Sequence, residues 1–468
     1  MTCSHYPINW LKIAKREQSQ QTSSLWADEF VEKAGKKLSG LKRQLNEITS
    51  GGLQVALRKI RAVPIWILAF CFFVFIRLIK RIILVRFDFI IPSRIGHLLI
   101  TPAIYLGHRQ IGTNMPSRRY LDLFYLQRAD AGFDHNWAAN DFILEKIRKR
   151  MHFLPRLLLS RVAVINGKFG NTEHSIITKG LPCDIRDLDD VFCNTNPPLW
   201  FTTKEEARGL EISSKMGLKE EKPFVCIYNR DNSYLAKVSP ISNWDFYQYR
   251  NFPASDLLVV ASTLIERGFD VVRMGSHVES KIKHLDPRII EYCDSEFQSS
   301  FMDVFLSNRC TAFFGSDSGL TVIPEIFKKT VGICNTLPLS LLTTNYSKAI
   351  VLPKILCEKA TGRLLSIRES FEFEQENSLD ESIFASSEIS YKFNSHEQLI
   401  DLVDETIARS QNTWVTTEDD EILQQRIWSH FDVDEIAARY NMTYHKTFRS
   451  TFSTLFLRKN KDWYLDPI

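Results

Sequence analysis

The sequence predicts an α/β protein with two doubly wound parallel domains, preceded by a basic helical region and an apolar segment that associates with a membrane. Three observations lead to this fold class. The second half of the chain alternates strand and helix patterns with short connections, the first half repeats that rhythm, and an apolar run with basic flanks precedes both. The chain has 468 residues, of which 44% are hydrophobic, so two cores of ordinary size can be buried.

The second domain is easiest to place from one succession of strand, turn, helix and strand. Residues 311–314 are mostly β-branched or aromatic, and residues 315–319 form a glycine and serine turn. Residues 320–328 have apolar side chains at helical spacing, and residues 331–334 are apolar again. In units of this order, ligands bind beyond the carboxyl ends of the strands, where a glycine turn opens a helix. The turn is therefore the first candidate for a binding site.

The turn has the composition of a phosphate cradle. Gly315 and Gly319 would let a ligand approach the backbone closely, and Ser316 and Ser318 would add hydroxyl donors. A carboxylate repels phosphate, so Asp317 is expected to accept from a ribose or sugar hydroxyl, or to cap the helix. The alternative is a plain helix cap with no ligand.

Two further loops are expected at the same edge of the sheet, because they follow neighbouring parallel strands. Arg230 and Asp231 follow the strand that begins at residue 224, and Arg273 and Gly275 follow the next one. An arginine fork suits a diphosphate, although a surface ion pair between Arg230 and Asp231 is the alternative. The loop at residues 249–251 offers a ring or a further cation. The predicted donor-binding residues are Arg230, Asp231, Arg273, Gly275, Gly315, Ser316, Asp317, Ser318, Gly319 and Glu325.

The first domain has a strand-to-helix turn of its own at residues 94–97. His97 lies at that turn, and an imidazole can take a proton from a hydroxyl group near neutral pH. Asp88, near the end of the preceding strand, is the competing base. A helix-capping or interdomain hydrogen bond is an equal alternative for His97.

The other expected elements follow from the same periods. Strands are expected at residues 82–89, 120–126 and 163–165, from residue 224, and at residues 269–274 and 289–292. Helices are expected at residues 98–106, 140–153, 202–216, 254–267, 301–308 and 421–431, and after a capping box of Ser395 and Gln398. The acidic stretch 366–394 is expected to be an exposed loop or hairpin, and the terminal helices to pack across both domains.

The N-terminal region is distinguished by charge and by hydropathy. Residues 1–62 hold 11 Lys and Arg against 5 Asp and Glu, a balance of +6 within a chain of net charge +4. The apolar run 65–76 is twelve residues long, shorter than the roughly 20 that a spanning helix needs. Its aromatic residues and basic flanks predict a helix that lies in an anionic leaflet, with a buried helix of the first domain as the alternative.

Other classes of site are not indicated. The nine cysteines form no CxxC pair, and no basic and aromatic stripe suggests nucleic acid. Asp187 and Asp189 match a metal-binding DxD pattern, but they follow no strand and are interpreted as a solvated loop. We therefore expect neither a metal nor a cofactor.

Several stretches together resemble a family of bacterial glycosyltransferases from surface-polysaccharide loci. They are FVCIYNRDNSYL, YQYRNFP, FDVVRMGS, SSFMDVFLSNRCTAFFGSDSGLTVIPEIF and the closing FLRKNKDWYL, with RIGHL and PPLWFTTKEEARG in the first half. The family is similar to GT-B glycosyltransferases, which implies two Rossmann-like domains facing a cleft and no required metal.

The resemblance suggests two different sugar donors. The NRD turn is similar to the turn by which fucosyltransferases hold a donor diphosphate, which points to Arg230, although Tyr228 and Asn229 replace the expected histidine pattern. The GSDSG turn is similar to the donor-side turn of lipopolysaccharide heptosyltransferases.

The resulting prediction is a metal-independent glycosyltransferase, hexosyl- or fucosyl-type, at the cytoplasmic face of the inner membrane. It would transfer a sugar from a nucleoside diphosphate to a surface glycan, lipid-linked or free, with no nucleic-acid partner. The alternatives are a nucleotide-sugar epimerase and a non-catalytic scaffold that binds sugar nucleotides. The predicted limits are 1–62 (basic helical region), 63–81 (membrane-associating segment), 82–200 (acceptor domain), 201–223 (hinge), 224–365 (donor domain), 366–394 (acidic segment) and 395–468 (terminal helices).

Overall fold

The computed structural model describes residues 57, 60–127, 138–170, 173–176, 187, 189–238, 243–282, 284, 286–343, 346–377, 379–432 and 448–465. The chain forms two compact units, Met1–Phe72 and Phe73–Ile468. Of the basic helical region predicted at residues 1–62, only residues 57 and 60–62 are described. The predicted domain limits inside the second unit remain predictions.

The apolar segment is a longer helix than the sequence indicated. It runs from Ile60 to Arg81, and within the described residues it is the one helix that is long and apolar enough to cross a membrane by length and composition. The sequence underestimated the length of the helix, because the helix continues past the run 65–76 at both ends.

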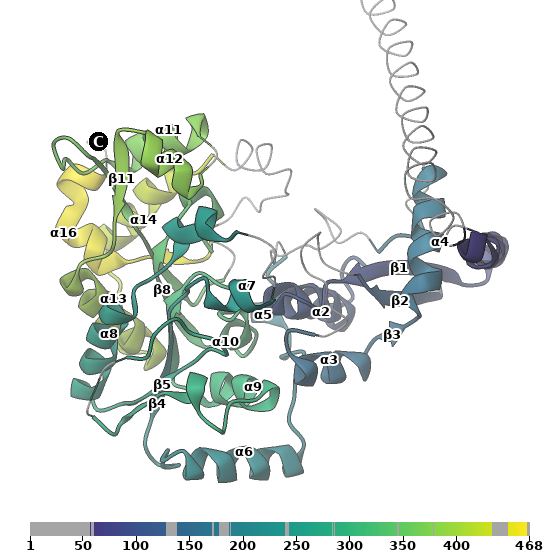
Figure 1. The fold of residues 1–468 in the computed structure, drawn as a ribbon, viewed down its shortest axis with the longest axis horizontal. Helices are drawn as coiled ribbons and strands as arrows, with labels where there is room; N and C mark the ends of the chain where they lie inside the picture. Colours follow the sequence, from purple (N-terminus) through teal and green to yellow (C-terminus); the bar gives the residue numbers. More distant parts are fainter. Residues whose placement is uncertain are drawn as a thin grey trace, which may run out of the picture. The chain divides into compact units, whose positions relative to one another are not determined.

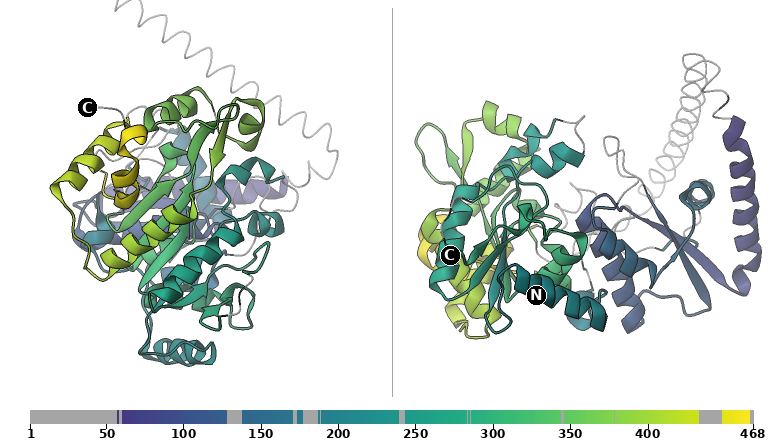
Figure 2. Two further views of the ribbon diagram at one scale, coloured as in Figure 1. Left: turned by 90° about the vertical axis from the view of Figure 1, so that its left-hand side faces the viewer. Right: turned by 60° about the horizontal axis from the view of Figure 1, so that its bottom comes forward.

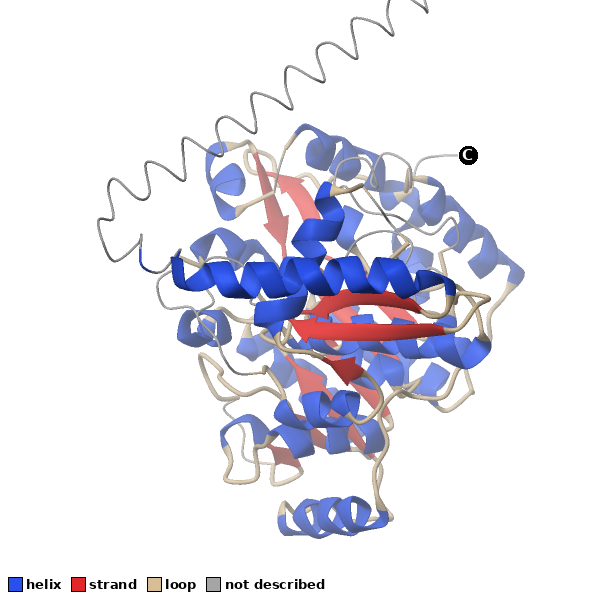
Figure 3. Ribbon diagram, turned by 90° about the vertical axis from the view of Figure 1, so that its right-hand side faces the viewer, coloured by secondary structure: helices blue, strands red, loops and turns tan. Residues whose placement is uncertain are grey.

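The first part of the second unit is built on a small parallel sheet in the order β1-β2-β3 (Figure 1). Figure 3 shows its two long strands side by side, with Leu84 opposite Tyr120 and Ile90 opposite Leu126. After α4 the chain returns to the free side of β1, where Phe87 and Ser175 form a parallel bridge. β1 therefore has neighbours on both sides, which places α2 at the point where the strand order reverses.

The main elements of this part are η1 Ile79–Arg81, β1 Leu84–Ile90, α2 Ile95–Ile111, β2 Tyr120–Leu126, α3 Asp141–Arg148, β3 His152–Phe153, α4 Arg156–Lys168, α5 Val191–Asn194 and α6 Thr203–Lys215. The strand predicted at residues 163–165 is wrong, because these residues lie inside α4. The edge strand is β3, in residues that the sequence placed at the end of a helix. An apolar triplet of this kind fits either element, and burial of Leu159, Val162 and Ile165 on one helix face decides it here.

The larger sheet confirms the doubly wound prediction for the second half. Its seven strands follow the order β12-β9-β8-β7-β4-β5-β6, and every pair is parallel. Strand order reverses between β4 and β7, where Cys226 lies opposite Phe313. Loops that follow these two strands therefore open at the crevice where doubly wound sheets bind ligands.

The elements from β4 onward are β4 Phe224–Tyr228, α7 Ser233–Val238, η2 Asp245–Arg250, α8 Ala254–Glu266, β5 Asp270–Arg273, β6 Ile289–Ile290, η3 Tyr292–Asp294, α9 Ser300–Arg309, β7 Ala312–Ser316, α10 Val322–Ile326, β8 Thr330–Thr336, η4 Leu339–Leu341, β9 Ala349–Pro353, β10 Ile355–Glu358, α11 Ile367–Glu376, α12 Glu381–Ser386, β11 Ile389–Lys392, α13 His396–Ser410, α14 Glu418–Ser429, β12 Thr451–Phe452 and α16 Thr454–Tyr464.

Helices pack closely on this sheet where glycine leaves room. A Cβ on Gly332 of β8 would lie 2.5 Å from the Thr406 hydroxyl of α13, so the glycine lets α13 approach the strands. The later helices cover the strands in the left view of Figure 2, in green and yellow. On the α9 side, Phe142 of α3 and Phe301 of α9 form an edge-on ring pair with centroids 5.2 Å apart, which extends the buried core to α3.

The acidic stretch 366–394 is neither an exposed loop nor a simple hairpin. It forms α11, α12 and β11, and β11 pairs antiparallel with β10. Glu374, one of the acids in this stretch, is buried and accepts from the amides of Leu339 and Ser340. Such long-range use of a carboxylate leaves no local signal in the sequence. The predicted capping box of Ser395 and Gln398 is confirmed at the start of α13.

Candidate functional site

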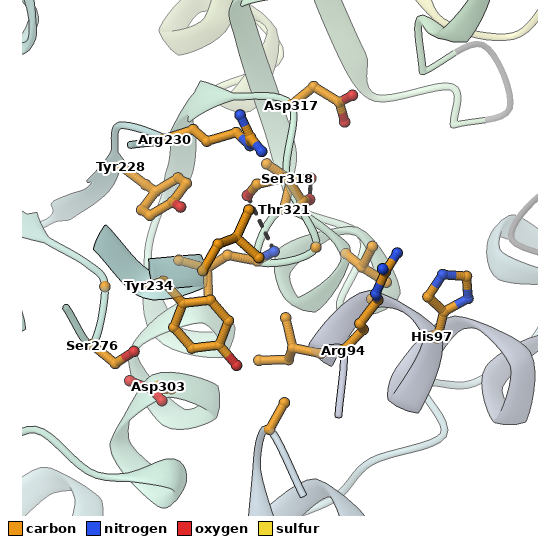
Figure 4. A pocket seen from close by; sticks show the side chains of 18 of the residues that line it. Arg94, His97, Tyr228, Arg230, Tyr234, Ser276, Asp303, Asp317, Ser318 and Thr321 are labelled. Atoms are coloured by element: carbon orange, nitrogen blue, oxygen red, sulfur yellow. Dashed lines mark hydrogen bonds between the residues drawn. The ribbon is translucent and has the colours of Figure 1, made fainter. Parts of the chain in front are cut away.

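A pocket of about 700 Å³ opens at the point where the order of the large sheet reverses (Figure 4). Its walls come from the loops after β4, β5 and β7, from η2, and from the starts of α2 and α9. Its polar and charged lining includes Arg94, His97, Tyr228, Arg230, Asp231, Tyr234, Tyr247, Arg250, His277, Asp303, Asp317, Ser318, Thr321 and Glu325.

Hydrogen bonds connect the loops that form the pocket. The backbone amide of Arg230 donates to the Ser316 hydroxyl at 2.8 Å, which ties the loop after β4 to the end of β7. The Asp231 carboxylate accepts from the amides of Ser233 and Glu279, both at 2.9 Å. Asp231 lines the pocket, but its two oxygens already hold the neighbouring loops.

Two arginines share one aromatic ring on the wall of the pocket. The guanidinium carbons of Arg230 and Arg250 lie 5.5 and 5.8 Å from the centre of the Tyr247 ring. Burial and the nearby positive charge of Arg250 lower the pKa of Arg230. A guanidinium keeps its proton under such conditions, so this wall concentrates two positive charges in a partly desolvated place.

A buried lysine supports the loop that carries Arg250. Lys354, between β9 and β10, donates to the carbonyls of Tyr249 and Asn251 at 2.5 and 2.8 Å. Asn251 in turn accepts from Arg230 at 3.1 Å through its side-chain oxygen. Burial lowers the pKa of Lys354 to about 7. The lysine therefore fixes the loop on both sides of Arg250.

The Asp317 carboxylate pairs with Arg250 and does not cap the helix that follows. The carboxylate accepts from Arg250 at 3.1 Å, and both side chains are about a quarter exposed. The turn is closed instead by Thr321, whose hydroxyl donates to the Ser318 carbonyl at 2.6 Å. The helix that follows, α10, has only five residues. The helix predicted at residues 320–328 is therefore shorter than expected, and the capping alternative for Asp317 is wrong.

Two buried carboxyl groups in the pocket lining have raised pKa values. Burial raises the pKa of Glu325 to about 8, and the negative charge of Asp317 adds to the shift. Burial also raises the pKa of Asp303 to about 7, against a hydrogen bond from Tyr292 at 2.8 Å. Glu325 is therefore largely a neutral acid at pH 7, able to donate a hydrogen bond to an anion.

Most predicted donor residues do line this pocket. Arg230, Asp231, Gly275, Asp317, Ser318, Gly319 and Glu325 contribute to its wall, as does His97 from the predicted acceptor side. Figure 4 shows Arg94 and His97 projecting from α2, with Ser318 and Thr321 on the neighbouring turn. The loop at residues 249–251 supplies a further cation, Arg250, whereas Tyr249 is buried away from the pocket.

Arg273 is not part of the pocket wall. Its side chain is completely buried, and its guanidinium donates to Asn229 at 2.8 Å, to the Ser280 carbonyl at 2.7 Å and to Glu291 at 3.2 Å. The predicted contact with a donor was therefore wrong. Through Asn229, Arg273 stabilises the loop that carries Arg230.

Gly315 and Ser316 also lie outside the pocket lining. A Cβ on Gly315 would come within 2.5 Å of the Tyr228 carbonyl, so this glycine allows β7 to pair with β4. Ser316 is buried and accepts from the Arg230 amide. Both residues build the sheet edge, and their predicted contacts with phosphate are not what the structure shows.

The two candidate bases are separated by the fold. His97 lies in the first turn of α2 and lines the pocket. Asp88 lies within β1, accepts from the Phe89 amide at 2.7 Å and is outside the lining. Burial raises the pKa of Asp88 to about 7. The geometry favours His97 over Asp88 as a group that could meet a substrate.

Asp303, Tyr234 and Thr321 were not among the predicted residues. Asp303 could have been found, because a helix that precedes a parallel strand begins at the carboxyl edge of the sheet, and Asp303 is in the first turn of α9. Tyr234 and Thr321 give no such signal.

The acidic DxD pattern has a structural use. The Asp187 carboxylate accepts from the amides of Val191 and Phe192, both at 2.8 Å, and is buried at the start of α5. Among the described residues there is no group of three or more His, Cys, Asp or Glu side chains that could hold a metal ion.

Comparisons with known proteins give distant likenesses in structure. No protein-family model matches the sequence, and no curated protein matches it. Among solved structures, the ADP-heptose lipopolysaccharide heptosyltransferase II of E. coli is 12% identical over 70% of this chain and 99% of its own, with a TM-score of 0.37.

A glycosyl transferase of family 9 from Veillonella parvula is also 12% identical, over 69% of this chain and 97% of its own, with a TM-score of 0.39. The UDP-GlcNAc 2-epimerase of Methanocaldococcus jannaschii is 9% identical over 68% of this chain and 99% of its own, with a TM-score of 0.27.

Proposed function

We propose that this chain is a glycosyltransferase of the GT-B type that takes its sugar from a nucleoside-diphosphate donor. The observation that carries the proposal is the pair Arg230 and Arg250 around Tyr247, placed at the strand-order reversal of a doubly wound sheet. Arginine forks match phosphate oxygens, and a 700 Å³ pocket accommodates a nucleotide sugar. The sequence motifs that resemble glycosyltransferases lie on the same loops.

The donor diphosphate would replace an existing ion pair. Arg250 now donates to Asp317, and a diphosphate between Arg230 and Arg250 would compete with that carboxylate. Asp317 would then be free to accept from a hydroxyl group of the ribose or the sugar. As the bond from the sugar to the phosphate breaks, the two guanidinium groups would stabilise the charge on the departing diphosphate without needing a metal ion.

Glu325 fits beside an anion because it is protonated. A carboxylate next to a diphosphate would repel it, but burial keeps this carboxyl group mostly neutral up to about pH 8. In that form it can donate its proton in a hydrogen bond to a phosphate or sugar oxygen. Donor binding should therefore weaken as the pH rises through 8.

His97 is proposed as the base that takes the proton of the acceptor hydroxyl. It reaches the pocket from α2, on the small sheet, whereas the arginines come from the large sheet. A base on one wall and a leaving group on another suit a single inverting displacement at the anomeric carbon. We propose a surface glycan, lipid-linked or free, as the acceptor, and the cytoplasmic face of the membrane as the place of reaction.

The test is a thermal-shift screen of the purified chain against UDP, GDP, ADP, CMP and dTDP. A ligand at 100 times its dissociation constant should stabilise the fold by about 2.7 kcal/mol. We expect one nucleotide to shift the wild type, with the shift lost in Arg230→Ala and Arg250→Ala. Arg267→Ala is the matched control, because that arginine follows the last residue of α8 and pairs with Asp404 of α13, outside the pocket lining.

Turnover separates the proposed activity from its alternatives. The sugar nucleotide selected by the screen is incubated with and without a membrane extract, and nucleoside diphosphate release is measured. Release that depends on the extract supports transfer. An epimerised sugar formed without extract would indicate an epimerase, and tight binding without any turnover would indicate a scaffold.

A further inference from the structure

A surface of exposed apolar and basic side chains lies on the small-sheet part of the second unit. It combines the end of the apolar helix and the residue that follows it, residues 73–82, with the outward face of α4. Its most exposed apolar side chains are Phe75, Leu78, Ile82, Leu157, Val164 and Phe169. Leu78 and Ile82 are 76% and 74% exposed, and Leu157 and Phe169 are 62% and 60% exposed. Single exposed leucines are ordinary, but a group of this size on adjoining elements marks an interaction site.

Two contacts join the two elements into one surface. Phe73, which is buried, stacks on Phe169 at the end of α4 with ring centres 5.2 Å apart. Farther along, Lys80 pairs at 3.1 Å with Glu173, just beyond α4. The exposed side chains of residues 74–82 therefore adjoin the exposed face of α4.

The charge on this surface has one sign. Residues 73–83 and 156–170 contain six basic residues and no acidic residue. On α4, Arg161 and Lys168 alternate with Leu157 and Val164 at spacings of three and four, so basic and apolar side chains share the outward face. Glu173 is next to the surface, but it is paired with Lys80.

We propose that this surface binds the headgroups of an anionic lipid bilayer, with α4 and the end of the apolar helix lying in the membrane plane. Aromatic and aliphatic side chains with a basic, acid-free surround are the composition of interfacial helices. Lysine and arginine stems can lie along the apolar surface while their charged ends reach phosphate groups. A protein partner would have to present a purely acidic surface, whereas an anionic leaflet presents one by its nature.

The packing of the apolar helix argues against a simple transmembrane span. Phe73 and Ile76 are buried on the folded unit, 2% and 0% exposed, so the last part of the helix belongs to the fold. The thirteen residues from 60 to 72 would extend only about 20 Å at 1.5 Å per residue, short of the roughly 30 Å of a hydrocarbon core. In-plane binding needs no such length. This inference is independent of the proposed enzymatic activity.

The test is flotation of the full-length chain with vesicles of phosphatidylcholine, with and without phosphatidylglycerol. Binding should require phosphatidylglycerol. Leu157→Glu with Val164→Glu should lower the bound fraction by about tenfold or more, because both apolar contacts are lost and two negative charges face the lipid. The matched control, Val415→Glu with Ile422→Glu, changes exposed apolar residues outside this surface and should bind as the wild type does.

Three outcomes would overturn the inference. One is equal flotation of the α4 variant and the wild type, which would place membrane binding elsewhere in the chain. Another is resistance of the bound chain to extraction by alkaline carbonate, which indicates a spanning helix. The last is a dimer, measured by light scattering without lipid, that the α4 variant dissociates, which would make the surface a contact between two copies.

Discussion

Gly96 and Gly319 lie in backbone contact across the pocket wall. A Cβ on Gly319 would be 2.8 Å from the Gly96 nitrogen and 3.0 Å from the Ile95 side chain, and a Cβ on Gly96 would be 3.2 Å from the Gly319 Cα. The contact joins the first turn of α2, which carries His97, to the turn that carries Asp317 and Ser318. The two turns can approach this closely because both residues are glycines. The two glycines therefore set the distance between the proposed base and the proposed donor site.

Gly319→Ala should move α2 away from the donor turn. Overpacking of this kind costs about 1–3 kcal/mol, and here the nearest atom, the Gly96 nitrogen, belongs to the backbone, which cannot rotate away. We expect turnover to fall by at least about tenfold while nucleotide affinity changes little, because Arg230 and Arg250 are not displaced. Gly167→Ala is the control, since a Cβ there meets nothing within 4 Å. Unchanged kcat with weaker nucleotide binding would show that the glycine serves the donor instead.

The order of the elements could be predicted because it depends on short-range patterns. Alternating apolar strands and helices specify a parallel sheet, and the reversal point of that sheet specifies where the pocket opens. The positions of Arg230, Asp317 and Ser318 followed from this reasoning. The strand predicted at residues 163–165 was wrong, because an apolar triplet fits a strand and one face of a helix equally well.

The fate of individual side chains could not be predicted in this way. Arg230 and Arg273 both follow or end a strand at the same sheet edge, yet Arg273 is turned inward by Asn229 and Glu291. Gly315 and Gly319 lie in the same glycine and serine turn of the sequence. Gly315 packs against the Tyr228 carbonyl, whereas Gly319 packs against Gly96. Each of these partners lies far away in the chain or in another strand, so only the folded packing decides.

Asp317→Asn should separate the two roles given to this carboxylate. The ion pair with Arg250 is partly exposed and worth about 0–1 kcal/mol, so its loss should strengthen the binding of inorganic pyrophosphate by up to about fivefold. If the carboxylate also accepts from a ribose hydroxyl, the nucleoside diphosphate should gain less than pyrophosphate does. Calorimetric titration with both ligands measures the difference. Equal gains would remove the contact between Asp317 and the ribose.

Lys354→Met should weaken nucleotide binding although the lysine is not part of the pocket wall. The change leaves the carbonyls of Tyr249 and Asn251 without their donor, which should cost about 1–3 kcal/mol of unfolding free energy and loosen the loop that holds Arg250. Lys359→Met is the matched control, because Lys359 also donates to carbonyls, those of Phe384 and Ser387, away from the pocket.

Urea denaturation and nucleotide titration of the two lysine variants give different readouts. Both variants should lose stability, and only Lys354→Met should lose affinity. A similar loss of affinity in both would mean that general loosening of the fold, and not the position of Arg250, explains the effect.

Asp88→Asn and His97→Asn should divide stability from catalysis. Burial raises the pKa of Asp88 in the folded chain from 3.8 to about 7, so between these values the native state keeps a proton that the unfolded state has lost. Stability therefore falls as the pH rises from about 4 to 7, by a few kcal/mol at most. The side-chain amide that Asp88→Asn introduces can still accept from the Phe89 amide without carrying a charge. The substitution should therefore flatten this dependence, as measured by urea denaturation at several pH values, and leave turnover unchanged.

His97→Asn should affect catalysis instead, with turnover lowered by about 10²-fold or more and nucleotide affinity kept. Lost turnover in Asp88→Asn, with His97→Asn active, would exchange the two assignments.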